Sequence, residues 1–140
     1  MKLLLDANVL VCALNDTGGV RGRLNEVQAS GATILTSVVV VGELSFGASA
    51  SARPDQNHAR LRAMLAKMEV VPFTEAAGHR FGDIKASLRR RGLAKGDADL
   101  QIAATAIVED ATLVTDDQAL LDGSIPEFRT ESWVGRGKGK

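Results

Sequence analysis

Short apolar runs alternate with longer stretches of mixed polarity along this chain. Runs of four or five mostly apolar residues are typical of strands that are buried on both faces of a parallel sheet. We predict strands at residues 2–5, 32–36, 69–73 and 111–115, and the pattern allows a fifth at 127–130.

The segments between these runs carry the periodicity and the end signals of helices. The expected helices begin near residue 8 and cover 20–31, 52–68, 74–92 and 97–110. Pro54 lies near a first helical turn, where proline is tolerated, Thr74 can cap the next helix, and Gly31 can adopt the left-handed conformation that ends a helix. Strands that alternate with helices predict one α/β domain with a mainly parallel sheet.

Residues 37–48 can be interpreted in two ways. Four consecutive valines favour a strand by propensity. Thr36 or Ser37 could instead cap a helix that carries Glu43. The pattern alone favours the strand.

The expected folded domain covers residues 1–134, without an internal repeat or a linker. The tail at 135–140 is polar and rich in glycine and basic residues, so we predict a disordered basic segment there.

Composition excludes several classes of protein. The 17 Lys and Arg residues balance the 17 Asp and Glu residues, which excludes a strongly basic nucleic-acid coat protein and confines any RNA contact to a local patch. Cys12 is the only cysteine, so a disulfide framework is excluded and a reducing compartment is indicated. No apolar run approaches the roughly 18 residues of a membrane span, and we expect a cytoplasmic protein.

Acidic residues stand where predicted strands end. Asp6 follows the first apolar run, and Asp116 and Asp117 follow the fourth. Ligands of parallel α/β sheets bind beyond the carboxyl ends of the strands, so these acids are candidates for one site. A helix cap at Asp6 and a surface turn at 116–117 explain the same residues equally well when each is taken alone.

Glu43 and Asp99 change this balance, because both are embedded in apolar sequence. Acidic side chains are almost never fully buried unless they are paired, and few cations lie near these two; Lys95 is the nearest in sequence. Clustered carboxylates raise one another's pKa, and a bound divalent cation relieves that repulsion. Ligation by carboxylate oxygens alone suits Mg²⁺ or Mn²⁺ rather than zinc.

The chain contains four segments that resemble, in this order, the motifs of PIN-domain ribonucleases: "LLLDANVLV", "GEL", "GDADLQIAATA" and "TLVTDD". More narrowly, they resemble VapC-type toxins of toxin–antitoxin pairs. The segment "EFRTESW" is similar to the closing strand and tryptophan of that group, so the resemblance extends from Met1 to about Val134. It implies a three-layer α/β/α fold with a mainly parallel five-stranded sheet, and a helix that carries Glu43.

The resemblance also implies a set of functional residues. Four acids would act as catalytic residues and metal ligands: Asp6, Glu43, Asp99 and Asp117. Four polar residues match supporting positions more weakly: Asn8, Asp97, Thr115 and Asp116. Two residues depart from the family pattern, since Ala7 stands where a hydroxyl side chain is frequent and Lys95 where an apolar residue is usual.

The activity that the resemblance implies is hydrolysis of RNA phosphodiester bonds with Mg²⁺, for which Mn²⁺ could substitute. One ion would lower the pKa of a bound water and a second could stabilise the leaving oxygen. The implied partners are the RNA, a cognate antitoxin protein whose basic segment covers the acids, and a second copy of the chain. Lys85 and the segment 88–92 could contact RNA or form a solvated helix face.

Three other functions compete with this one. A phosphoryl-signalling domain also places acids at strand ends, but it needs an acceptor aspartate after the third strand, and "EVVPFT" has none. A haloacid-dehalogenase-type phosphatase would need a second aspartate at the position of Asn8. A PIN-like binding partner that has lost catalytic activity is kept open by Ala7.

Asp97 and Asp99 compete for one role in the helix predicted over 97–110. At about 100° per residue, the two lie nearly opposite each other. Asp99 shares its side with Leu100 and Ala103, where an unpaired carboxylate is costly. We therefore predict Asp99 as the metal ligand and Asp97 as a structural residue that can cap the helix.

Overall fold

The computed structural model describes residues 1–134 and contains a parallel sheet of five strands in the order β3-β2-β1-β4-β5. The strands are β1 (Lys2–Leu5), β2 (Thr33–Ser37), β3 (Glu69–Val71), β4 (Thr112–Val114) and β5 (Thr130–Glu131). The helices are α1 (Ala7–Asn15), α2 (Val20–Ala29), α3 (Val38–Ser49), α4 (Pro54–Leu65), α5 (Glu75–Arg90), α6 (Asp97–Val108) and α7 (Gln118–Leu121). The predicted parallel α/β architecture is confirmed.

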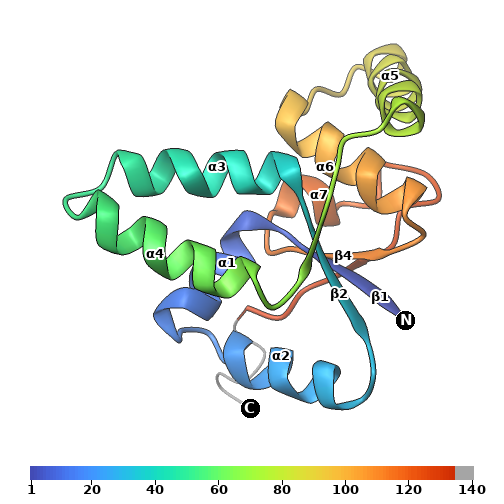
Figure 1. The fold of residues 1–140 in the computed structure, drawn as a ribbon. Coiled ribbons are helices and arrows are strands. Elements are labelled where there is room, and N and C mark those ends of the chain that lie inside the picture. Colours follow the sequence, from blue (N-terminus) through green and yellow to red (C-terminus); the bar gives the residue numbers. More distant parts are fainter. Residues whose placement is uncertain (135–140) are drawn as a thin grey trace.

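The order of the strands explains the layers. The chain moves from β1 to β2 and β3 in one direction across the sheet, and then returns to β4 and β5 on the other side of β1. Because crossovers between parallel strands are right-handed, helices made on the outward and on the return path cover opposite faces. Figure 1 shows α1, α2 and α4 on one side of the strands, and α5, α6 and α7 on the other.

The first strand in the sequence is central in the sheet and fully enclosed. Leu3, Leu4 and Leu5 are all buried, as a strand covered by helices on both faces requires. Trp133 is buried in the same core, near the end of the described chain. The carboxyl end of β1 is therefore surrounded by structure, and Asp6 directly follows it.

Residues 38–49 form helix α3, as the resemblance implies and against the propensity of the valines. The Ser37 hydroxyl accepts from the Val39 N–H at 3.0 Å and caps the helix. Val40 is fully buried, so packing of the apolar side chains compensates for their weak helix propensity. The cap at Thr74, Pro54 in the first turn of α4, and the left-handed Gly31 with φ of 91° match their predictions.

The ends of strands β3 and β5 differ from the prediction for local reasons. β3 ends at Val71 because Pro72 has no N–H for the ladder. β5 is Thr130–Glu131 rather than 127–130, because Glu127 adopts a left-handed φ of 57° that interrupts an extended chain. The short α7 was not predicted. The tail predicted at 135–140 lies outside the described residues, and within residues 1–134 no helix has the length and apolarity to cross a membrane.

Candidate active site

Asp6 and Thr115 lie side by side where two central strands end. β1 and β4 are parallel neighbours with Leu5 opposite Val114, so the next residues of both strands emerge at the same edge. The Thr115 hydroxyl donates to Asp6 Oδ2 at 2.7 Å, and the Ala7 N–H donates to Asp6 Oδ1 at 2.8 Å. Asp6 is only 4% exposed, so these bonds fix its carboxylate. They also make Asp6 the N-cap of α1, so the cap and the site interpretations are compatible.

The same threonine fixes Asp117. The Asp117 N–H donates to Thr115 Oγ1 at 3.1 Å. Asp117 Oδ1 accepts from the Ala119 N–H at 3.0 Å, which makes Asp117 the N-cap of α7. One hydroxyl therefore links the side chain of Asp6 to the backbone of Asp117.

Glu43 and Asp99 approach these two acids from helices α3 and α6, which contact each other. Burial raises the pKa of Glu43, and the charges of Asp6 and Asp99 raise it further. Burial also raises the pKa of Asp99, and so do the neighbouring carboxylates of Asp117 and Asp6. The fold thus brings Asp6, Glu43, Asp99 and Asp117 within electrostatic reach of one another, and we call these four residues the acid quartet.

The acid quartet suits a divalent cation by its chemistry. Burial raises the pKa of Asp6, hydrogen bonds from Thr115 and Ala7 lower it in part, and the charge of Asp117 raises it again. Within residues 1–134, no three acidic, histidine or cysteine side chains are close enough together to make a ready-formed metal site. Carboxylate oxygens are the ligands that Mg²⁺ and Mn²⁺ prefer, and a cation would relieve the repulsion.

Asn8 and Asp116 support the turn that carries Asp117. Asn8 Oδ1 accepts from the Asp116 N–H at 3.2 Å, which connects α1 to the end of β4. The Asp116 carboxylate accepts instead from the Ser132 hydroxyl at 3.4 Å. Asp116 therefore binds the segment after β5, while Asp117 faces the other acids.

Asp97 is engaged outside the acid quartet. Its carboxylate pairs with Lys85 of α5 at 2.9 Å. The prediction that Asp97 caps α6 is wrong, because the helix begins at Asp97, Gly96 is the N-cap, and the ion pair holds the carboxylate. Asp99 is the residue that the structure places beside the other acids, on the side that the helical phase predicts.

Lys95 lies close to Asp99, and its charge lowers the pKa of Asp99 against the stronger influences that raise it. Its Nζ donates to the Ala119 carbonyl and to Asp122 Oδ2, the latter at 2.7 Å. Asp122 was not identified from the sequence. It lies 27 positions from Lys95 in a segment that has only the signals of a turn, so no local pattern could reveal the contact.

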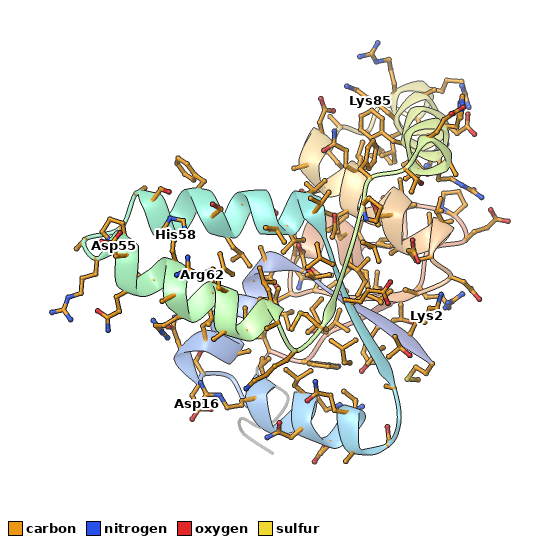
Figure 2. All side chains as sticks on the ribbon, viewed as in Figure 1. Lys2, Asp16, Asp55, His58, Arg62 and Lys85 are labelled. Carbon is orange, nitrogen blue, oxygen red and sulfur yellow. The ribbon has the colours of Figure 1, made fainter. Side chains whose placement is uncertain are left out.

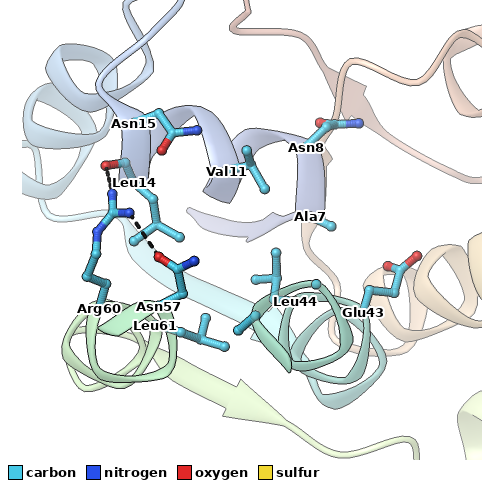
Figure 3. Close-up of a pocket in the computed structure, with 12 residues that line it drawn as sticks. Ala7, Asn8, Val11, Leu14, Asn15, Glu43, Leu44, Asn57, Arg60 and Leu61 are labelled. Atoms are coloured by element: carbon cyan, nitrogen blue, oxygen red, sulfur yellow. Dashed lines mark hydrogen bonds between the residues drawn. The ribbon is translucent and has the colours of Figure 1, made fainter. Parts of the chain in front are cut away.

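A groove of about 420 Å³ runs between α1 and the hairpin of α3 and α4 (Figure 3). Ala7, Asn8 and Glu43 line the end beside the acid quartet, while Asn57 and Arg60 line the opposite end. The apolar side chains between them are Val11, Leu14, Leu44, Ala48 and Leu61. The sequence analysis did not predict this groove, because it forms only when α4 folds back on α3.

Known proteins share both the sequence and the fold. A family model described as PIN domain matches residues 3–123. The chain is 34% identical to Ribonuclease VapC2 of Rickettsia felis over 95% of this chain and 98% of that protein. It is 31% identical to the tRNA(fMet)-specific endonuclease VapC of Shigella flexneri, again over 95% and 98%.

Solved structures give the same result. VapBC2 from Rickettsia felis, bound to a DNA fragment from its promoter, has a TM-score of 0.87 at 34% identity over 95% of this chain and 99% of that chain. DNA-bound VapBC from Salmonella typhimurium has a TM-score of 0.86 at 28% identity over 95% and 98%. The three-layer fold and the family that the motifs predict are thereby confirmed, and the chain belongs to the PIN domain family.

Proposed function

We propose that this protein is a divalent-metal-dependent endoribonuclease and the toxin of a toxin–antitoxin pair. The observation that carries the proposal is the convergence of four carboxylates from four segments of the chain, with raised pKa values at Asp6, Glu43 and Asp99. The names of the VapC relatives support it. We infer that the acid quartet binds Mg²⁺, with Mn²⁺ as a substitute.

A bound divalent cation supplies a water nucleophile at neutral pH and neutralises charge that develops on the phosphate. The residues of the protein supply and orient the ligands. Thr115 and the Ala7 N–H orient Asp6, and the Ala119 N–H orients Asp117. Glu43 and Asp99 contribute the other two carboxylates from the helices opposite. Hydrolysis by water would leave a 5′-phosphate and a 3′-hydroxyl.

Cleavage of labelled RNA by the purified protein tests this function. We expect cleavage in Mg²⁺, loss of cleavage in EDTA, and recovery when Mg²⁺ is restored. Sequencing of RNA 5′ ends after brief expression would identify the substrate, and tRNA belongs in this test because one relative is named a tRNA(fMet)-specific endonuclease. A folded protein that binds Mg²⁺ but cleaves no RNA would favour the inactive binding partner instead.

We infer that RNA approaches the acid quartet across the C-terminal end of α5. Arg89 and Arg90 are exposed there, and neither forms an ion pair within residues 1–134. Lys85 is already engaged by Asp97. Exposed guanidinium groups without a carboxylate partner are suited to phosphate, and the loop after α5 leads directly to the helix that carries Asp99.

A matched pair of double variants tests this RNA surface. Arg89→Ala with Arg90→Ala should raise the KM for RNA and reduce the slope of log affinity against log salt by about 0.7 for each lost contact to a single strand. Arg53→Ala with Arg62→Ala removes the same charge from the N-cap and the last turn of α4. Helix α4 lies at the other end of the molecule from Lys85 on α5 in Figure 2. Equal effects of both double variants would contradict a local RNA surface.

We infer that the antitoxin occupies the groove between α1 and the hairpin of α3 and α4. The groove offers apolar side chains to a partner helix or strand, and its acidic end offers Glu43 to a basic residue. Val11→Glu in the groove should abolish co-purification with the antitoxin from the same operon. Val108→Glu, a similarly exposed valine on α6 at 38% against 42% for Val11, should leave it unchanged.

We also propose that the protein forms a homodimer and that residues 1–134 form the nuclease domain. Both statements come from the resemblance of the motifs to the VapC group. Light scattering of the purified protein tests the first, and RNA cleavage by a chain that ends at residue 134 tests the second.

A further inference from the structure

The side chain of Lys95 is buried between the segment before α6 and the end of α7. Only 6% of it is exposed. Its ammonium group donates to the Ala119 carbonyl and to the Asp122 carboxylate. We call Lys95, Ala119 and Asp122 the Lys95 bridge.

The Lys95 bridge contacts Asp117, a member of the acid quartet, through Ala119. Ala119 accepts from Lys95 through its carbonyl and donates to Asp117 Oδ1 through its N–H. Asp122 is held in turn by the Ser124 N–H at 2.9 Å and the Ser124 hydroxyl at 2.6 Å. A continuous set of hydrogen bonds therefore connects the start of the helix that bears Asp99 to the side chain of Asp117.

Lys95 is the buried partner of this ion pair, whereas 46% of the Asp122 side chain is exposed. Such a pair is weak evidence for stability, because the desolvation of the buried ammonium group offsets much of the attraction. Its better-supported effect is to select one arrangement of the elements that it joins. The bridge joins the segment just before α6, the helix that carries Asp99, to the C-terminal end of α7, the helix whose N-cap is Asp117.

We propose that Lys95 is a positioning residue that holds α7 against the start of α6, so that Asp117 and Asp99 keep the relative placement that a divalent cation needs. This inference rests on the proposed metal-dependent nuclease function. It also gives a role to the residue that departs from the apolar position usual in the family.

A second Lys–Asp pair at the same helix provides a control. Lys85 and Asp97 are 2.9 Å apart at the start of α6, but their side chains are 41% and 60% exposed. Exposed pairs contribute little to stability and constrain the elements that they join only weakly. Lys85→Met and Lys95→Met remove the same charge and the same bond type, one from the surface and one from the Lys95 bridge.

Two possible roles of Lys95, as a nearby positive charge or as a positioning residue, predict opposite effects of Lys95→Met on cation binding. If Lys95 acted only as a nearby positive charge, its removal would strengthen the binding of a cation. If it positions Asp117, its removal weakens that binding although a repulsive charge is lost. The direction of the change in Mg²⁺ affinity therefore separates the two.

The experiment combines three measurements on the full chain. Hydrogen exchange in EDTA reports the Ala119 N–H without metal, thermal shift against Mg²⁺ gives the half-saturating concentration, and RNA cleavage gives kcat and KM. For Lys95→Met we expect faster hydrogen exchange at the Ala119 N–H. We also expect a 10- to 100-fold loss shared between Mg²⁺ affinity and kcat, which is roughly the effect of removing a group that orients a metal ligand. The KM for RNA should change by no more than about twofold, and Lys85→Met should leave exchange and Mg²⁺ affinity unchanged.

Unchanged exchange at Ala119, or unchanged or tighter Mg²⁺ binding by Lys95→Met, would overturn the proposal. If Lys95→Met does not fold, Asp122→Asn decides, because it weakens the bridge at its exposed end and must also lower Mg²⁺ affinity. A wild-type protein that neither binds Mg²⁺ nor cleaves RNA would instead refute the proposed function. The exchange measurement would still show whether Lys95 orders α7.

Discussion

The two halves of the acid quartet differ in how the protein holds them. Asp6 and Asp117 follow strands, each accepts a backbone N–H, and the Thr115 hydroxyl links them. Glu43 and Asp99 project from helices. Within residues 1–134, neither of these two carboxylates accepts a hydrogen bond from a backbone N–H or a hydroxyl group. We infer that Asp6 and Asp117, the fixed pair, are held in place before a cation binds. Glu43 and Asp99, the adjustable pair, can change position. Stability should then depend on the fixed pair, and activity on the whole set.

The largest expected effect is on catalysis by the adjustable pair. Asp99→Asn should reduce single-turnover RNA cleavage by roughly 100-fold or more, because a metal contributes several kcal/mol of transition-state stabilisation. The variant should remain folded, and should be at least as stable as the wild type in EDTA because a repulsive charge is removed.

Asp97→Asn is the control for this variant, since it changes the same chemical group two positions away. It should keep most of the activity, because Asp97 is engaged by Lys85 at the surface. An inactive Asp97 variant together with an active Asp99 variant would reverse the assignment of the two residues.

The next effect is stabilisation by metal. At a Mg²⁺ concentration 100 times its Kd, the native state should gain about 2.7 kcal/mol over the metal-free protein. Thermal unfolding in Mg²⁺ and in EDTA measures this gain, which Asp99→Asn should largely abolish. An equal melting temperature in both conditions would argue against a metal site.

Loss of the threonine that links the fixed pair should destabilise the protein itself. Thr115→Val leaves the buried Asp6 carboxylate without one donor, which costs about 1–3 kcal/mol. Thr115→Ser keeps the hydroxyl and should retain most of the stability. Urea unfolding in EDTA compares the two, and a larger loss in Thr115→Ser than in Thr115→Val would show that the methyl group of Thr115, rather than its hydroxyl, is what matters.

The smallest expected effect is the dependence of metal-free stability on pH. Burial raises the pKa values of Asp6, Glu43 and Asp99, so the native state takes up protons at a higher pH than the unfolded chain does. Stability in EDTA should therefore increase as the pH falls from neutral through these raised pKa values, and the gain is complete near the ordinary values of 3.8 and 4.5.

Urea unfolding between about pH 8 and pH 5 measures this slope. Asp99→Asn should flatten it and Asp97→Asn should not. The hydrogen bond from Lys95 holds the pKa of Asp122 well below its usual range, so the stabilising contribution of Asp122 is lost only below the ordinary value and does not affect the measurement. A wild-type stability that decreases as the pH is lowered over this range would contradict the raised pKa values.

Features set by a few neighbouring residues could be predicted from the sequence. The strand at 2–5, the cap at Thr74 and the first-turn position of Pro54 depend on local composition, and the structure has all three. The helical phase of α6 distinguished Asp99 from Asp97 because the 3.6-residue period is also local.

Features set by distant partners could not be predicted. The helix at 38–49 opposes the propensity of its valines and was expected only from the resemblance to a family. The ion pair between Lys95 and Asp122 spans 27 positions. The role of Asp97 as a cap was predicted wrongly because Lys85, 12 positions earlier, takes up its carboxylate.

The bond between Thr115 and Asp6 has a kinetic consequence, because it joins residues 109 positions apart. β1, made first, must pair with β4 before the two fixed acids can meet. Contacts between residues so far apart in the sequence slow folding, since a long loop must close before the contact forms. A chain that has formed only β1 to β3 with their helices contains Asp6 and Glu43 without Asp99 or Asp117 in place. Nuclease activity should therefore arise in the last stage of folding, with no active intermediate.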